Sequence, residues 1–159
     1  MAGSVEDLET LRTRLAGRRA RGEQIVLTNG VFDLLHVGHL RSLRAARGLG
    51  DVLVVGVNRD ISVRGLKPGR PLVPEDERAE LVAALEPVDY AVLFGERTAD
   101  ALIRAVKPDV YVKGGDYTPD TLPERASVAE AGARLVLVPL LPEHSTTLLI
   151  ARLRGTAQV

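Results

Sequence analysis

The chain lacks cysteine, and this absence excludes several kinds of chemistry. None of its 159 residues is a cysteine, so disulfides, thiolate nucleophiles and cysteine-based metal sites are all excluded. No apolar run approaches the roughly 18 residues that a membrane-spanning helix needs, and the N-terminus has no hydrophobic signal-peptide region. We therefore expect a soluble, cytoplasmic protein without membrane contacts.

The chain also lacks an excess of charge of either sign. Lysine and arginine together number 21, as do aspartate and glutamate, so the formal net charge is zero. A broad nucleic-acid footprint needs surplus positive charge, so we expect no nucleic-acid partner, although a local basic pocket is compatible with this balance. The length predicts a single domain over residues 1–159, able to bury roughly 70% of its unfolded-chain surface.

Helices and strands are predicted to alternate along the chain. Residues 1–24 are predicted to form a leading helix, because Val5, Leu8, Leu11 and Leu15 recur at helical spacing. An α/β core over 25–159 follows, with strands at 25–27, 52–57, 90–94, 110–112 and 135–138 and helices at about 37–48, 75–86, 98–106, 123–131 and 146–154. This alternation predicts a Rossmann-like, doubly wound parallel sheet of five strands in a three-layer α/β/α arrangement.

The segment 28–39, Thr-Asn-Gly-Val-Phe-Asp-Leu-Leu-His-Val-Gly-His, joins the first of these strands to its helix. His36 and His39 fall on one face of the first helical turn, and Gly38 between them leaves room for a ligand. Helix N-termini carry unpaired N–H groups and partial positive charge, so this junction favours a phosphate. A metal site that includes Asp33, or a purely structural role for the histidines, is the alternative.

Three further polar segments follow predicted strands, whose carboxyl ends form the ligand-binding edge of such sheets. Lys67 and Arg70 lie in a Gly/Pro-rich loop, Lys113-Gly114-Gly115-Asp116 follows the fourth strand, and Ser145-Thr146-Thr147 opens the last helix. The two glycines let the backbone pass close to a ligand, and a helix that starts with Ser/Thr has the geometry of a phosphate site. Each of the three segments also has a plain structural interpretation, as an exposed loop, a tight turn and a helix cap respectively.

Three side chains near the second strand are weaker candidates. Asn58 and Asp60 end that strand and suit either hydrogen bonds to sugar hydroxyls or a helix cap. Arg78, in the predicted helix at 75–86, is either a phosphate contact or an ordinary charge on the helix surface.

The segment 29–39 resembles the H-x-G-H signature of the nucleotidyltransferase superfamily, which includes cytidylyltransferases and adenylyltransferases. Within it, the chain most resembles the adenylyltransferase domain of ADP-heptose synthases, over nearly its whole length. The further residues that carry this likeness are Arg41-Ser42-Leu43, Gly50-Asp51, Val55-Gly56-Val57-Asn58, Arg70-Pro71, Lys113-Gly114-Gly115-Asp116-Tyr117 and Ser145-Thr146-Thr147.

The resemblance implies that a heptose 1-phosphate oxygen attacks the α-phosphorus of ATP, which carries Mg²⁺, and that pyrophosphate leaves. Catalysis of this kind is mainly positioning and charge stabilisation. By resemblance, the catalytic residues that hold the reacting phosphates are His36, His39 and Lys67, Arg70 supports the nucleotide, and Arg78 is a further phosphate contact. The remaining nucleotide contacts are Thr28, Asn29, Gly30, Val31, Phe32, Asp33, Gly38, Lys113, Gly114, Gly115, Asp116, Ser145, Thr146 and Thr147. Asn58 and Asp60 would face the sugar, and Asp33 would orient a histidine or meet Mg²⁺ through water.

Lys67 departs from the family pattern, because it is followed directly by Pro68, whereas relatives usually have a glycine after the lysine and one more residue before Arg-Pro.

One alternative function is that of a cytidylyltransferase for glycerol 3-phosphate. Such enzymes typically carry Arg-Thr-Glu-Gly-Ile-Ser-Thr before the last helix, and this alternative is disfavoured because residues 141–146 are Leu-Pro-Glu-His-Ser-Thr. A non-catalytic nucleotide-binding module is another. The resemblance also implies a homodimer and a separate sugar kinase earlier in the pathway. We expect His144 to face solvent.

Overall fold

The computed structural model describes residues 2–139 and 143–155. Its strands are β1 (Ser4–Val5), β2 (Ile25–Gly30), β3 (Val52–Asn58), β4 (Tyr90–Phe94), β5 (Val110–Gly114) and β6 (Arg134–Val138). Its helices are α1 (Leu8–Ala20), α2 (Val37–Arg47), α3 (Asp60–Arg64), α4 (Glu75–Ala83), α5 (Asp100–Val106), α6 (Arg125–Glu130) and α7 (Thr146–Leu153). No helix among these residues is both long enough and apolar enough to span a bilayer.

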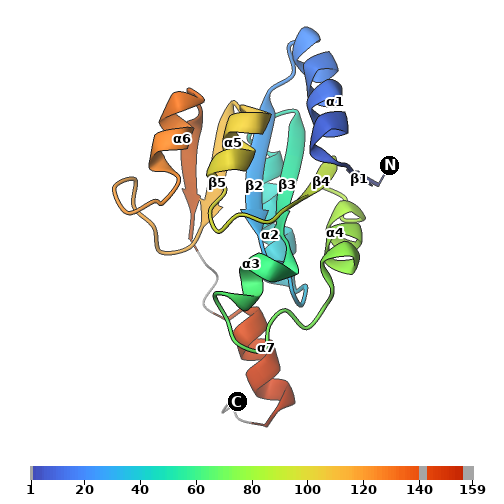
Figure 1. Cartoon of the computed structure of the whole chain (residues 1–159), viewed down its shortest axis with the longest axis vertical. Helices are drawn as coiled ribbons and strands as arrows, with labels where there is room; N and C mark the ends of the chain where they lie inside the picture. Colours follow the sequence, from blue (N-terminus) through green and yellow to red (C-terminus); the bar gives the residue numbers. More distant parts are fainter. Residues whose placement is uncertain (1, 140–142, 156–159) are drawn as a thin grey trace.

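The six strands form one parallel sheet in the order β1-β4-β3-β2-β5-β6. Helices α1, α5 and α6 pack on one face of the sheet, and α2 and α4 pack on the other (Figure 1). Helix α7 projects beyond the carboxyl ends of the strands (Figure 1). The predicted doubly wound α/β fold in three layers is therefore confirmed.

The central strand β3 shows why this sequence forms a sheet covered on both faces. All seven of its residues are buried, and five of them are valine or leucine, as expected for a parallel strand between two helical layers. Gly56 is the one residue of this strand without a side chain. A methyl group there would lie 2.5 Å from the side chain of Leu102, so the glycine lets α5 approach the sheet closely.

The strand order reverses between β2 and β5. The chain adds β3 and β4 on one side of β2, and then crosses to place β5 and β6 on the other. In open α/β sheets a ligand binds outside the carboxyl ends of the two strands that flank such a reversal. The fold therefore points to the ends of β2 and β5 as the place to look for a site.

The N-terminal segment corrects two predictions, because the sheet has six strands and residues 1–24 are not one helix. Ser4 and Val5 pair with Tyr90 and Ala91 of β4. Helix α1 begins only after Asp7, whose side chain accepts a hydrogen bond from the Thr10 N–H at 2.9 Å. A two-residue edge strand is too short to show a period of its own, and the spacing of Val5 from Leu8 happens to match that of a helix.

Aspartates placed immediately before three strands tie each strand to its neighbour. The carboxylates of Asp51, Asp89 and Asp109 accept hydrogen bonds from the backbone N–H groups of Gln24, Leu53 and Ile25 at 2.8, 2.8 and 2.7 Å. These N–H groups lie at the amino edge of the sheet. The carboxylates therefore help to fix the register of the parallel strands.

We expect Asp109→Ala to lower the free energy of unfolding by about 1–2 kcal/mol, because the N–H of the fully buried Ile25 would lose its acceptor. Urea denaturation of the purified variant measures this change. Asp120→Ala is the matched control, since Asp120 pairs with Arg125 only on the exposed surface, and its effect should stay below about 0.5 kcal/mol. Equal effects for the two variants would contradict this role of Asp109.

Candidate active site

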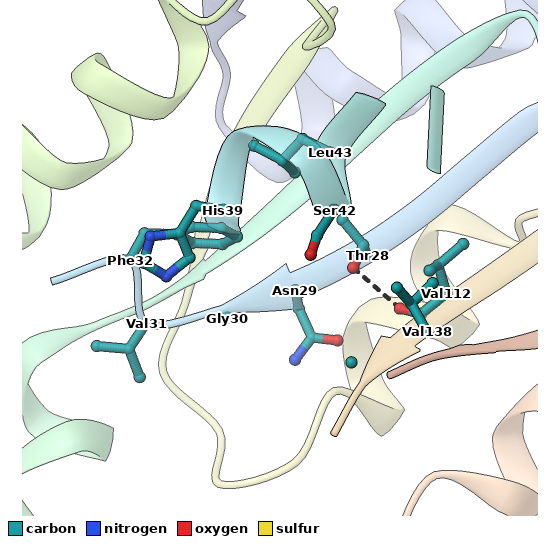
Figure 2. A pocket seen from close by; sticks show the side chains of 11 residues that line it. Thr28, Asn29, Gly30, Val31, Phe32, His39, Ser42, Leu43, Val112 and Val138 are labelled. Atoms are coloured by element: carbon teal, nitrogen blue, oxygen red, sulfur yellow. Dashed lines mark hydrogen bonds between the residues drawn. The ribbon is translucent and has the colours of Figure 1, made fainter. Parts of the chain in front are cut away.

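A cavity of about 180 Å³ opens at the carboxyl edge of the sheet, where the strand order reverses. Its walls are the end of β2 with the turn that follows it (28–32), the side chains of His39 and Ser42 on α2, and the ends of β5 and β6 (Figure 2). The predicted residues Thr28, Asn29, Gly30, Val31, Phe32, His39 and Gly114 all line it. Three residues that were not predicted as site residues, Ser42, Leu43 and Val138, also line the cavity. Ser42 could have been predicted from the sequence, because it lies about one helical turn after His39 and therefore on the same face of α2.

Two hydrogen bonds between strands β2 and β5 hold this edge in shape. The Thr28 hydroxyl donates to the Val112 carbonyl at 2.9 Å (Figure 2). The Tyr111 hydroxyl donates to the Asn29 side-chain oxygen at 2.6 Å. Burial raises the pKa of the Tyr111 hydroxyl, so it keeps its proton at neutral pH. The Asn29 amide is therefore fixed with its N–H₂ group left as a donor.

The two motif histidines lie together at the start of α2. His36 is the N-cap residue, and its backbone N–H donates to the His39 Nδ1 at 3.3 Å. The two rings stack with centroids 3.9 Å apart, and the His39 ring also lies 5.3 Å from the ring of Phe32. Phe32 adopts a left-handed backbone conformation, with φ of 53°. Strained backbone of this kind is concentrated at functional sites.

The surroundings of both histidines lower the pKa of their rings. Burial, and then the charge of His36, lowers the pKa of His39 to about 4 from its ordinary value of 6.5. Burial, and then the charge of His144, lowers the pKa of His36. A neutral His39 whose Nδ1 accepts a hydrogen bond carries its proton on Nε2. It can therefore present a ring N–H donor to an anion in the cavity.

Among the described residues, the hydrogen bonds and ion pair of Asp33 go to the loop before α4 and not to either histidine. This does not support an orienting role, and a contact with Mg²⁺ through water stays a prediction. Asp33 is only 4% exposed. One carboxylate oxygen accepts hydrogen bonds from the N–H groups of Leu72 and Val73 at 2.8 and 2.9 Å, and the other lies 3.6 Å from the guanidinium of Arg70. Asp33 therefore holds the loop before α4 against the motif, and Arg70 pairs with it.

Arg78 was expected to be either a phosphate contact or an ordinary charge on the helix surface. Both predictions are wrong, because the residue is completely buried. Its guanidinium donates to the Val31 carbonyl at 2.6 Å, to the Val73 carbonyl at 2.8 Å and to the Asp60 carboxylate at 2.7 Å. These contacts use all three guanidinium nitrogens. Arg78 thus braces the turn after β2 from inside, and its partner Asp60 is turned toward it instead of standing free for a sugar.

The other predicted residues after β3 do not converge on the histidines. The Asn58 side chain is 8% exposed and donates to the Ser62 hydroxyl at 3.4 Å. Lys67 lies on an exposed turn, and its ammonium has no partner among the residues that the structure describes. Helix α3, which begins at Asp60 and was not predicted, separates the strand end from this turn.

The loop after β5 is divided between two faces. Strand alternation turns Val112 and Gly114 toward the cavity and Lys113 to the opposite side. There the Lys113 ammonium pairs with the buried Glu124 carboxylate at 3.1 Å. Gly115 has a φ of +124°, which favours glycine, and Asp116 is exposed.

Helix α7 begins beside the histidine motif. Ser145 caps it, accepting a hydrogen bond from the Leu148 N–H at 3.0 Å, and the Thr146 hydroxyl donates to the Leu34 carbonyl at 2.9 Å. Thr147 is exposed. His144 is half-buried beside His36, which corrects the expectation that it faces solvent. Residues 141 and 142 of the motif used against a cytidylyltransferase lie outside the described residues.

No group of three or more His, Asp or Glu side chains suited to a metal ion occurs within residues 2–139 and 143–155. The arrangement at the cavity is instead one of donors: the His39 ring, the Asn29 amide and the N–H groups that begin α2. Donors without a paired carboxylate favour an anionic ligand.

Comparison with known proteins finds a matching family and several similar proteins. A family described as cytidylyltransferase-like matches residues 27–151. The bifunctional protein HldE of Trichlorobacter lovleyi is 50% identical over 149 residues, covering 93% of this chain and 30% of that protein. The HldE of Syntrophotalea carbinolica is 51% identical over 146 residues, covering 91% and 30%. The chain thus spans about 30% of the length of these relatives.

A solved structure is also similar. The crystal structure of the lipopolysaccharide core biosynthesis protein from Thermoplasma volcanium GSS1 matches with a TM-score of 0.63 and 34% identity. The match covers 76% of this chain and 98% of that one. The likeness therefore extends over nearly all of a shorter protein.

The low pKa of His39 predicts that stability falls in acid. Between its ordinary value of 6.5 and about 4, the unfolded chain binds a proton that the folded protein does not. The contribution of His39 is fully present above pH 6.5 and is lost as the pH falls toward 4. Urea unfolding of the wild type and His39→Asn across this range should show a flatter pH dependence for the variant. A His39 titration near 6.5 by NMR would contradict this prediction.

We expect Arg78→Met to lower the free energy of unfolding by about 3–5 kcal/mol, because it removes the buried partner of Asp60 and leaves two carbonyls without these donors. Chemical denaturation measures the loss. Arg12→Met, at an exposed position on α1, is the matched control and should change stability by less than about 0.5 kcal/mol. A near-neutral Arg78→Met would show that the guanidinium does not brace the turn.

Proposed function

The chain belongs to the cytidylyltransferase-like family, and we propose that it is an adenylyltransferase that moves AMP from ATP to heptose 1-phosphate. The products would be ADP-heptose and pyrophosphate. The observation that carries this proposal is the stacked pair of His36 and His39 where α2 begins, beside a cavity at the strand reversal. About 50% identity to HldE proteins and likeness to a lipopolysaccharide core biosynthesis protein support the sugar phosphate as acceptor.

The proposed reaction is a single displacement at phosphorus. An oxygen of the sugar 1-phosphate forms a bond to the α-phosphorus, and the bond from that phosphorus to the oxygen bridging to the β-phosphorus breaks. The nucleophile is already an anion, so neither a general base nor a covalent intermediate is needed. The chain's own contribution is to hold the two phosphates in line and to stabilise charge on the leaving oxygen.

The positions of the site residues suit these two tasks, which are to hold the phosphates and to stabilise the developing charge. Neutral His39 would donate its Nε2–H to the nucleotide phosphates, together with His36 and the first N–H groups of α2. The base would lie in the cavity between the ends of β2 and β5, where Gly114 lets a flat ring approach the backbone. Mg²⁺ would enter as part of the ATP complex. Homodimer formation and supply of the phosphorylated sugar by a separate kinase stay predictions.

The substrate assignment is tested by pyrophosphate release with ATP or CTP against a panel of phosphorylated acceptors. We expect release with ATP and heptose 1-phosphate and little with glycerol 3-phosphate. Turnover with CTP alone would overturn the choice of base. Nucleotide binding without turnover on any acceptor would favour the non-catalytic module, with which the unpartnered Lys67 is compatible.

The role of the histidines is tested by His39→Ala, which we expect to lower kcat about 10²–10³-fold, the usual cost of losing one preorganised transition-state donor. His39→Asn is the matched variant, because its amide keeps an N–H donor near the same place, and it should lose less activity. Thermal unfolding of both variants controls for damage to the fold. An effect of His39→Ala below about fivefold would contradict the proposed role.

A further inference from the structure

All three histidines of the chain lie together, although only two belong to the motif on α2. The ring of His144 stands 6.4 Å from the ring of His36 at an angle of 25°, and His36 stands 3.9 Å from His39. His39 lines the cavity, and His144 does not. The three rings therefore run outward from the cavity in the order His39, His36, His144.

Contacts between two helix starts fix His144 in this position. A methyl group on Gly38 would lie 2.9 Å from the His144 Cβ and 2.8 Å from the His36 Nδ1, so both side chains pack over the first turn of α2. The Thr146 hydroxyl bonds to the Leu34 carbonyl and ties the start of α7 to the loop before α2. The row of rings thus lies where the positive ends of two helices meet.

Within the described part of the chain, none of the three histidines forms an ion pair with a carboxylate. The nearest acid of the motif, Asp33, is occupied by the loop at Leu72 and Val73 and by Arg70. The His36 Nδ1 is buried and has no hydrogen-bond partner among the described residues. A buried ring nitrogen without a partner, near two helix starts, suits an extended anion.

We propose that His144 is a third imidazole ligand of the nucleotide, donating a ring N–H to the β- and γ-phosphates from the α7 side. This inference rests on the proposed function, because its ligand is the polyphosphate of ATP. The base would occupy the cavity beside His39, and the phosphate chain would extend past His36 toward His144. The contact involves hydrogen bonds only, and no bond of the nucleotide is formed or broken by it.

Calorimetric titration with α,β-methylene-ATP, AMP and adenosine tests the proposal. His144→Phe keeps a flat ring over Gly38 and removes both ring nitrogens. We expect it to weaken α,β-methylene-ATP binding about tenfold, which corresponds to about 1.4 kcal/mol, and to change AMP and adenosine binding less than twofold. Glu143→Ala, at the exposed neighbouring position, is the matched control and should bind all three compounds like the wild type.

Failure of the His144 contact and failure of the proposed adenylyltransferase function give different results in this titration. A wild-type protein that does not bind α,β-methylene-ATP would overturn the proposed function. Normal wild-type binding with an unaffected His144→Phe, or an equal loss for AMP and for the triphosphate analogue, would overturn the role of His144 alone.

A second measurement needs no variant of the site. With only three histidines in the chain, the ¹⁵N signals of the imidazoles are few enough to follow separately. Titration of the wild type with inorganic tripolyphosphate should shift the ring signals of His144, His36 and His39 together. A His144 signal that stays fixed while the other two shift would overturn the proposal.

Discussion

The site depends on the absence of a side chain at Gly38. The His36 ring and the His144 Cβ both come within 3 Å of the place where a methyl group would stand. This close approach brings the start of α7 onto the start of α2, beside the end of β2. The stacked rings, the free N–H groups of α2 and the cavity edge therefore share one small region at the strand reversal.

A shell of charged side chains holds this region in shape without facing the cavity. Asp33 fixes the loop before α4, and the fully buried Arg78 reaches from α4 to the turn at Val31 and to Asp60. Buried ion pairs often contribute little net stability against an apolar replacement. Their value here is positional, since each joins segments that are distant in sequence and that both border the motif.

The sequence allowed the fold to be predicted better than the detail of the site. Continuous Val/Leu runs and helical periodicity located the core strands within a few residues, and the H-x-G-H segment was placed correctly at the carboxyl edge. Strand β1 and helix α3 are too short to show a period. The partners of Asp33, Arg78 and Lys113 depend on which loops meet in space, and so does the place of His144. Local sequence holds no signal for such long-range pairings.

In the proposed function, the edge of the sheet at the reversal between β2 and β5 binds ATP with its phosphates on the histidines. A crystal structure of the protein with α,β-methylene-ATP tests this most directly. We expect the base in the cavity beside Gly114 and Val138, and the phosphates within hydrogen-bond distance of His36 and His39. A nucleotide bound instead in the groove beside Arg59 and Gly95, with its phosphates away from both histidines, would contradict it.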